Sequence, residues 1–368
     1  MAKKKTKKKV RKKAKKKSSI SKSSATFASK DNALFVGIDL GTSCASVSAS
    51  NGVREVVPTY VGYPKDNISE ELLGNQPLFG DMALKHRLSV ELIRPLAHGV
   101  IQTGSKEQNK MYLTAAKQLV RHLLEKARPK PDQPVYGVIG APARASISSK
   151  RILIDAARGV LDAVMIVSEP FAVAYGLEIL DQALVIDIGA GTVDLCRLHG
   201  TLPGKQDQIT LDEAGDFVDD KLSKMIRKKY PNAQFTINMV RKLKERYGFV
   251  SKSADRITTK FPVKGRPKEF DITDELRTAC KSIVPGMIDS IAELIATYDP
   301  EFQENIRSNV ILAGGGSQMV GLSNLIEEAM VELGGGKVTR VDEPLFAGSN
   351  GALKMAKQMP MHFWQMLA

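Results

Sequence analysis

Two segments of the chain share one pattern: an apolar strand, an aspartate, a turn rich in small residues, and a second strand. The first copy is ALFVGIDLGTS at 33–43, with Asp39, and the second is ALVIDIGAGTVDLCRL at 183–198, with Asp187. An internal repeat at a spacing of about 150 residues indicates two lobes of one topology that arose by duplication. The length of 368 residues agrees with this, because a chain of that size normally divides into more than one core.

The residues around the first turn predict a β-meander. Small and polar residues alternate over 45–50, Asn51-Gly52 is a two-residue hairpin signal, and we expect a further strand over Val53–Val61. A dinucleotide-binding fold is excluded here, because a helix would have to follow the glycine turn directly. Helical and strand patterns then alternate, which indicates an α/β layer with a mixed sheet; we expect helices over 112–127 and 149–160 and strands over 134–139 and 164–167.

The two turns together suit a polyphosphate. Glycines lack a Cβ, so backbone N–H groups can approach phosphate oxygens closely. Carboxylates repel phosphate, so Asp39 and Asp187 make sense if they hold Mg²⁺, through waters that the ion retains. Either turn alone could equally be an ordinary tight turn capped by aspartate. The candidate phosphate-binding residues are Gly41, Thr42 and Ser43 in the first turn, and Gly189, Ala190, Gly191 and Thr192 in the second.

A third glycine cluster lies in NVILAGGGSQMVGL at 309–322. An apolar strand runs into Gly314, Gly315 and Gly316, and we expect Ser317 to cap a helix over 322–333. A flat backbone surface at a helix N-terminus suits an α-phosphate and a purine ring. A plain turn between a strand and a helix is the alternative.

Five motifs, in order along the chain, resemble those of the superfamily of actins, sugar kinases and heat-shock chaperone ATPases. They look like the phosphate-1, connect-1, phosphate-2, adenosine and connect-2 motifs, and read DLGTS at 39–43, SEPFAVAYG at 168–176, DIGAGTVD at 187–194, AGGGSQMVGL at 313–322 and FAGSNGAL at 346–353. The resemblance implies an α/β fold of two RNase H-like lobes, with ATP or ADP and Mg²⁺ in the cleft between them. It also implies a hinge of two helices, which the patterns over 170–179 and 349–358 fit, with Gly176 and Gly351 permitting close packing.

The resemblance, together with the charge of the first 30 residues, indicates a division of the chain into four parts. We expect a disordered tail at 1–30, lobe I at 31–180, lobe II at 181–345, and a C-terminal helix returning to lobe I at 346–368. The bacterial actins in this superfamily have a glutamate where Glu169 stands, which polarises the attacking water. Lys244 and Glu245 match the Lys-Glu helix that reaches ribose and adenine, although an ordinary exposed charged helix would look the same.

Four further stretches, less constrained by nucleotide binding, are similar to the actin-like filament proteins of magnetosome-forming bacteria: VGYPKD at 61–66, IGAPARAS at 139–146, VSEPFAVAYGL at 167–177 and PMHFWQML at 360–367. The resemblance implies a slow ATPase, converting ATP and water to ADP and phosphate, that polymerises into cytoskeletal filaments. We expect it in the cytoplasm, positioning magnetosomes, with catalytic roles for Glu169 and Asp187. The alternatives are a non-polymerising small-molecule phosphotransferase of the same fold and a monomeric ATP-dependent adaptor.

The net charge of +14 comes from the first 30 residues, which hold 14 Lys and Arg and no Asp or Glu. Such a segment buries too little apolar surface to offset the entropy of ordering it, so we expect disorder. It could be a solubilising leader, or it could bind an anionic membrane surface or magnetosome membrane proteins. Specific nucleic-acid binding is disfavoured, because no aromatic residue precedes Phe27 to stack on bases.

Overall fold

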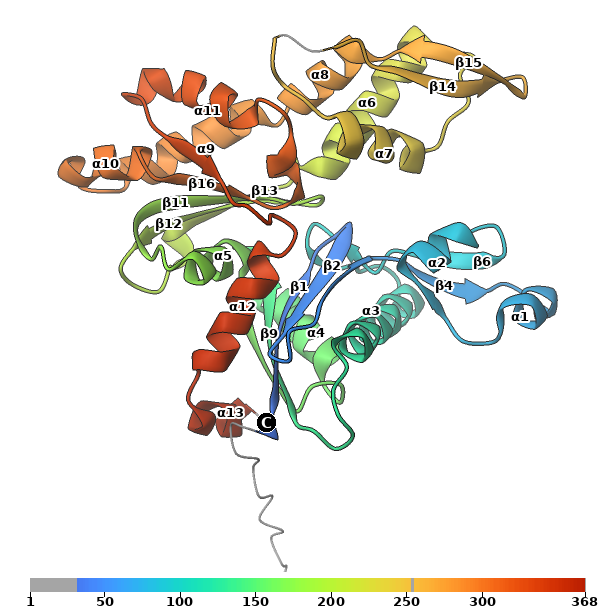
Figure 1. The fold of residues 1–368 in the computed structure, drawn as a ribbon, viewed down its shortest axis with the longest axis horizontal. Coiled ribbons are helices and arrows are strands. Elements are labelled where there is room, and N and C mark those ends of the chain that lie inside the picture. The colour runs from blue at the N-terminus through green and yellow to red at the C-terminus, as the bar shows by residue number, and fades with distance from the viewer. Residues whose placement is uncertain (1–31, 253–254, 368) are drawn as a thin grey trace, which may run out of the picture.

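The computed structural model describes residues 32–252 and 255–367, so the predicted tail at 1–30 lies outside the described residues. The centre of the protein consists of two five-stranded sheets, one above the other in Figure 1. The first has the order β10-β9-β1-β2-β3 and consists of β1 (Leu34–Leu40), β2 (Cys44–Ala49), β3 (Arg54–Pro58), β9 (Val135–Ala141) and β10 (Ala163–Ser168). The second has the order β13-β12-β11-β16-β17 and consists of β11 (Asp181–Ile188), β12 (Val193–His199), β13 (Gln208–Leu211), β16 (Val310–Ala313) and β17 (Val338–Arg340).

The two sheets have one topology. In each, the strand before the turn pairs antiparallel with the strand after it, and pairs parallel with a strand on its other side. Asp39 lies opposite Ser46 on β2, and Asp187 lies opposite Asp194 on β12, so the two aspartates occupy equivalent places. The predicted pair of α/β lobes with mixed sheets is therefore confirmed.

Helices cover both sheets. In the first lobe, α3 (Lys106–Ala127) and α4 (Ile147–Ala157) bury apolar side chains in one core with the sheet. Helix α3 begins six residues before the predicted start, because Ser105 and Gln108 form a capping box there. The second lobe carries α6 (Gly215–Lys229), α7 (Ile237–Tyr247), α8 (Thr273–Lys281), α9 (Val284–Ala296), α10 (Pro300–Arg307) and α11 (Leu322–Met330).

Smaller elements extend each lobe on one side (Figure 1). The first lobe adds α1 (Asn67–Leu73), α2 (Gly80–Lys85), β4 (Val61–Pro64), β5 (Leu78–Phe79), β6 (Val90–Ile93), β7 (Leu96–Ala97) and β8 (Val100–Ile101), and the second adds the hairpin of β14 (Thr258–Val263) and β15 (Arg266–Asp271). None of the described helices is long and apolar enough to cross a bilayer.

The predicted single strand over Val53–Val61 is wrong. Strand β3 ends at Pro58, and β4 begins at Val61 in a separate three-stranded sheet with β5 and β6. The break occurs because Thr59 is buried against the first turn, where its hydroxyl donates to the carbonyl of Gly41 at 2.8 Å and its amide donates to Ser43 at 2.8 Å.

Two helices, α5 (Glu169–Leu177) and α12 (Ala347–Gln358), cross between the sheets (Figure 1). They meet at glycines: a Cβ on Gly351 would lie 1.8 Å from the carbonyl oxygen of Ala172, and one on Gly176 would lie 2.9 Å from the Cα of Gly351. After them, α13 (Met361–Leu367) buries Trp364, which stacks on Tyr136 at 5.4 Å between ring centroids.

Candidate functional site

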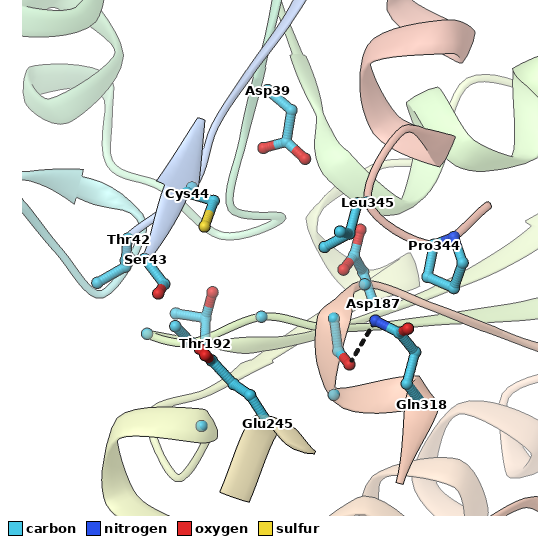
Figure 2. A pocket seen from close by; sticks show the side chains of 18 of the residues that line it. Asp39, Thr42, Ser43, Cys44, Asp187, Thr192, Glu245, Gln318, Pro344 and Leu345 are labelled. Atoms are coloured by element: carbon cyan, nitrogen blue, oxygen red, sulfur yellow. Dashed lines mark hydrogen bonds between the residues drawn. The ribbon is translucent and has the colours of Figure 1, made fainter. Parts of the chain in front are cut away.

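A cavity of about 360 Å³ lies between the two sheets and gathers the predicted site residues from both lobes (Figure 2). Figure 2 shows Thr42, Ser43 and Cys44 on one side of it and Asp187 and Gln318 on the other. Of the predicted site residues, Ser317 alone does not line it. Those that do are Asp39, Gly41, Thr42, Ser43, Glu169, Asp187, Gly189, Ala190, Gly191, Thr192, Lys244, Glu245, Gly314, Gly315 and Gly316.

The two glycine turns touch each other across the cleft. A Cβ on Gly191 would lie 2.3 Å from the hydroxyl of Thr42 and 2.8 Å from the Cα of His98. The Thr42 hydroxyl is itself engaged, because it accepts a hydrogen bond from the amide of Gly99 at 2.8 Å. Gly191 is thus required for contact between the turns, and the hydroxyl of Thr42 holds the first turn to the turn between β7 and β8.

The surroundings of the three glycines in the third cluster differ. Gly314 has a φ of 73°, and a Cβ there would lie 2.3 Å from Oδ1 of Asp187. A Cβ on Gly316 would lie 2.3 Å from Cγ2 of Ile188. Around Gly315 the nearest atom is Cδ2 of Leu345 at 3.6 Å, so Gly315 offers open backbone to the cavity.

The predicted helix cap at Ser317 is wrong. A 3₁₀ turn, Gly315–Gln318, separates β16 from α11, and the residue that precedes α11 is Gly321. The hydroxyl of Ser317 donates instead to the carbonyl of Gly314 at 2.7 Å. Ser317 therefore stabilises the glycine turn without lining the cavity.

Three carboxylates, Asp39, Glu169 and Asp187, meet in the cavity with raised pKa values. Burial raises the pKa of Asp39 to about 6. Burial, and then the charge of Asp39, raise the pKa values of Glu169 and Asp187 well above their usual range. Oε1 of Glu169 is buried without a hydrogen-bond partner among the described residues.

This carboxylate group fits a hydrated divalent cation. Uncompensated buried negative charge is costly, and a cation would lower these pKa values. Within residues 32–252 and 255–367, no cluster of three or more acidic, His or Cys side chains lies close enough to hold a metal directly. Mg²⁺ suits such a site because it keeps several of its waters and needs few protein ligands.

The raised pKa of Asp39 predicts a pH-dependent stability. A carboxyl that binds its proton more tightly in the folded protein stabilises it at low pH, and this contribution is lost as the pH rises from about 4 through about 6. We expect Asp39→Asn to raise the unfolding temperature of protein free of nucleotide and Mg²⁺ at pH 8, with a smaller gain at pH 5. Asp132→Asn is the control, because Asp132 is exposed and its φ of 58° suits asparagine equally. Equal gains for both variants at pH 8 would contradict the prediction.

Lys244 and Glu245 differ in how free their side chains are to contact a ligand in the cavity. Nζ of Lys244 donates to the carbonyl of Gly215 at 2.7 Å and pairs with Asp219 at 2.9 Å, so it holds α6 against α7. Burial raises the pKa of Glu245, whose side chain points toward the cavity in Figure 2. Glu245 is therefore the freer of the two to meet a ligand.

Several lining residues escaped the sequence-based prediction: Cys44, Arg241, Gln318, Met319, Pro344 and Leu345. Gln318 and Met319 stand inside the third glycine motif, whose interpretation rests on its glycines and Ser317. Arg241 precedes Glu245 by four residues and so shares its helix face, which was a usable signal. No pattern in the sequence marks Pro344 and Leu345 as site residues, because only the fold brings their loop to the cavity.

Comparisons with known proteins agree with this geometry. The family model described as MreB/Mbl protein matches residues 33–362. The actin-like protein MamK of Paramagnetospirillum magneticum is 38% identical over 91% of this chain and 96% of its own length. A MamK double helical filament matches with a TM-score of 0.86 at 38% identity, covering 89% of this chain and all of that one. A non-polymerising MamK mutant bound to AMPPNP matches with a TM-score of 0.68, also at 38% identity, covering 89% of this chain and 99% of that one.

Two lobes of one topology, joined by crossing helices around a glycine-lined cleft, define an actin-like protein. More particularly, the chain belongs to the MreB/Mbl family, and its similarity to MamK confirms the resemblance that the sequence indicated.

Proposed function

We propose that this protein is an actin-like ATPase that binds ATP with Mg²⁺, hydrolyses it slowly and polymerises into cytoskeletal filaments. The observation that carries the proposal is the cleft, in which two glycine turns face three carboxylates, Asp39, Glu169 and Asp187, whose pKa values are raised by burial. The AMPPNP-bound MamK mutant and the MamK filament support it by similarity.

In this proposal, the backbone amides of the two turns bind the β- and γ-phosphates, and Gly315 offers its backbone to the adenosine. Asp39 and Asp187 would hold Mg²⁺ through waters, and the bound ion would supply neutralisation of phosphate charge. Glu169 accepts a hydrogen bond from the attacking water through its unpartnered oxygen and orients it. The first turn carries no lysine, so the amides supply the protein's own share of charge stabilisation there.

The similarity to the MamK filament supports the proposal that this chain polymerises. The subunit of the MamK double helical filament has a shape that this chain matches with a TM-score of 0.86. We propose that ATP bridging the lobes stabilises this shape, and that head-to-tail contacts then repeat without closing.

Sedimentation and negative-stain microscopy of purified protein with ATP, with ADP and without nucleotide test the proposal. Filaments that require ATP support it. ATP consumption that depends on an added small hydroxyl or carboxyl compound would favour the phosphotransferase instead. Protein that binds ATP but stays monomeric would favour the adaptor.

By similarity to MamK, we further propose that the filament positions magnetosomes in the cytoplasm. We propose that lobe I comprises residues 31–180, that lobe II comprises 181–345, and that 346–368 return to lobe I. In the structure, α12 and α13 pack against the first lobe, where Trp364 shares a cluster with Phe35 and Tyr136.

The Lys-rich tail is proposed to attach the filament to anionic membrane. Each basic residue near such a surface contributes about 1 kcal/mol. We expect deletion of residues 2–30 to preserve ATPase activity and polymerisation and to abolish salt-sensitive binding to vesicles that contain phosphatidylserine. Cosedimentation at roughly 0.15 M salt, where the Debye length is about 8 Å, measures it. Full-length protein that ignores these vesicles would overturn the membrane role.

A further inference from the structure

We propose that Arg94 and Asp216 form a clamp that holds the two glycine turns in register, and so act as positioning residues for the site. The effect that we expect on nucleotide affinity rests on the proposed function. The clamp itself is inferred from contacts between the lobes. Arg94 lies between β6 and β7 in the first lobe, and Asp216 lies in the first turn of α6 in the second.

On the first-lobe side, Arg94 binds the first turn directly. Its Nε donates to the carbonyl oxygen of Thr42 at 2.8 Å. The rest of its guanidinium reaches across the cleft, where Nη1 lies 2.7 Å from Oδ2 of Asp216 and Nη2 lies 3.1 Å from Oδ1. Two parallel contacts of this kind fix orientation as well as distance.

On the second-lobe side, Asp216 is bound to the second turn through its backbone. Its amide donates to the carbonyl of Ala190 at 2.7 Å, and the amide of Gly215 donates to Gly189 at 3.1 Å. An unbroken path therefore runs from Thr42 through Arg94 and Asp216 to Ala190. Movement of one turn away from the other has to break a charged, bidentate contact.

A second arginine, Arg241, supports the clamp. Arg241 donates to Oδ1 of Asp216 at 3.0 Å and to Oδ2 of Asp219 at 3.1 Å, and its third contact is the hydroxyl of Tyr60 in the first lobe, at 2.6 Å. The side chain of Arg241 is 11% exposed and that of Arg94 is 21% exposed, so solvent screens these pairs less than it screens an ordinary surface bridge.

The chain provides a matched control. Arg54 and Glu343 also form a charged pair between the lobes, at 2.8 Å, but neither residue contacts a glycine turn. Arg54→Ala therefore removes one bridge between the lobes and leaves the clamp intact. Arg94→Lys keeps the charge but cannot reproduce the fork that binds Thr42 and Asp216 together.

The first measurement is hydrogen–deuterium exchange over 41–46 and 189–193 in nucleotide-free protein. We expect Arg94→Ala and Asp216→Asn to raise exchange at both turns by roughly tenfold or more, with Arg94→Lys intermediate and Arg54→Ala equal to the parent. Exchange that rises at one turn alone, or equally in Arg94→Ala and Arg54→Ala, would overturn the clamp. Asp216→Glu guards against misfolding, because it keeps the negative charge that faces Arg94 and Arg241: exchange at both turns below that of Asp216→Asn supports the clamp, and exchange equal to that of Asp216→Asn contradicts it.

The second measurement is affinity for AMPPNP with Mg²⁺. We expect Arg94→Ala to lose about tenfold, because binding then has to bring the turns together, while Arg54→Ala retains the parent affinity. Parent protein that does not bind AMPPNP would refute the proposed function, whereas the exchange measurement would still decide on the clamp.

Discussion

Replacing Glu169 with alanine is expected to slow ATP hydrolysis by roughly 10²-fold or more while leaving nucleotide binding largely intact. Glu169 opens α5, beside β9, where a Cβ on Gly140 would lie 3.1 Å from its Cγ. Its buried Oε1 has no partner within the described residues, so the carboxylate is free to orient a water. Removal of the side chain takes away that contact and also lowers the negative charge around Asp39 and Asp187.

The same variant is expected to form filaments that persist, since we propose that ATP bridges the lobes and that loss of the γ-phosphate weakens this bridge. Steady-state phosphate release and the lag before depolymerisation measure the two effects. Asp187→Ala is the contrasting change and is expected to weaken Mg²⁺-dependent nucleotide binding as well. Hydrolysis by Glu169→Ala at the parent rate would remove the catalytic role from Glu169.

Features that depend on local sequence could be predicted. The strands before Asp39 and Asp187 are continuous apolar runs, and glycines mark each turn, so the repeat, the mixed sheets and the gathering of the glycine clusters followed from the sequence. The crossing helices were implied by the resemblance, and Gly176 and Gly351 agreed with it because they permit close backbone approach.

Features set by contacts between residues far apart in the sequence could not be predicted. Nothing local at Thr59 tells that its hydroxyl binds Gly41 and ends β3. Ser317 has the chemistry of a helix cap, and a 3₁₀ turn that the glycines permit diverts it. The clamp joins Arg94 to Asp216 across 122 residues of sequence, and both look like ordinary surface charges.

The second large effect is expected at the crossing of α5 and α12. A Cβ on Gly351 would lie 1.8 Å from the carbonyl oxygen of Ala172, and both groups belong to helix backbones that cannot yield as a flexible side chain does. The same helix is held on its other face, where a Cβ on Gly37 of β1 would lie 2.1 Å from the carbonyl of Ser349. Helix α12 is therefore confined on two sides, and a methyl group at 351 has to push α5 and α12 apart.

We expect Gly351→Ala to destabilise the protein by at least about 3 kcal/mol, at the upper end for overpacking. For a large domain this corresponds to a fall of roughly 6–10 °C in unfolding temperature. Gly286→Ala is the matched control, because Gly286 is also helical, in α9, and its nearest neighbour would be Cδ1 of Leu211 at 3.7 Å. Alanine there is expected to be neutral or to stabilise by up to about 1 kcal/mol, through helix propensity alone. Calorimetry that finds the two variants equally stable would contradict the tight crossing and, with it, the hinge that joins the lobes.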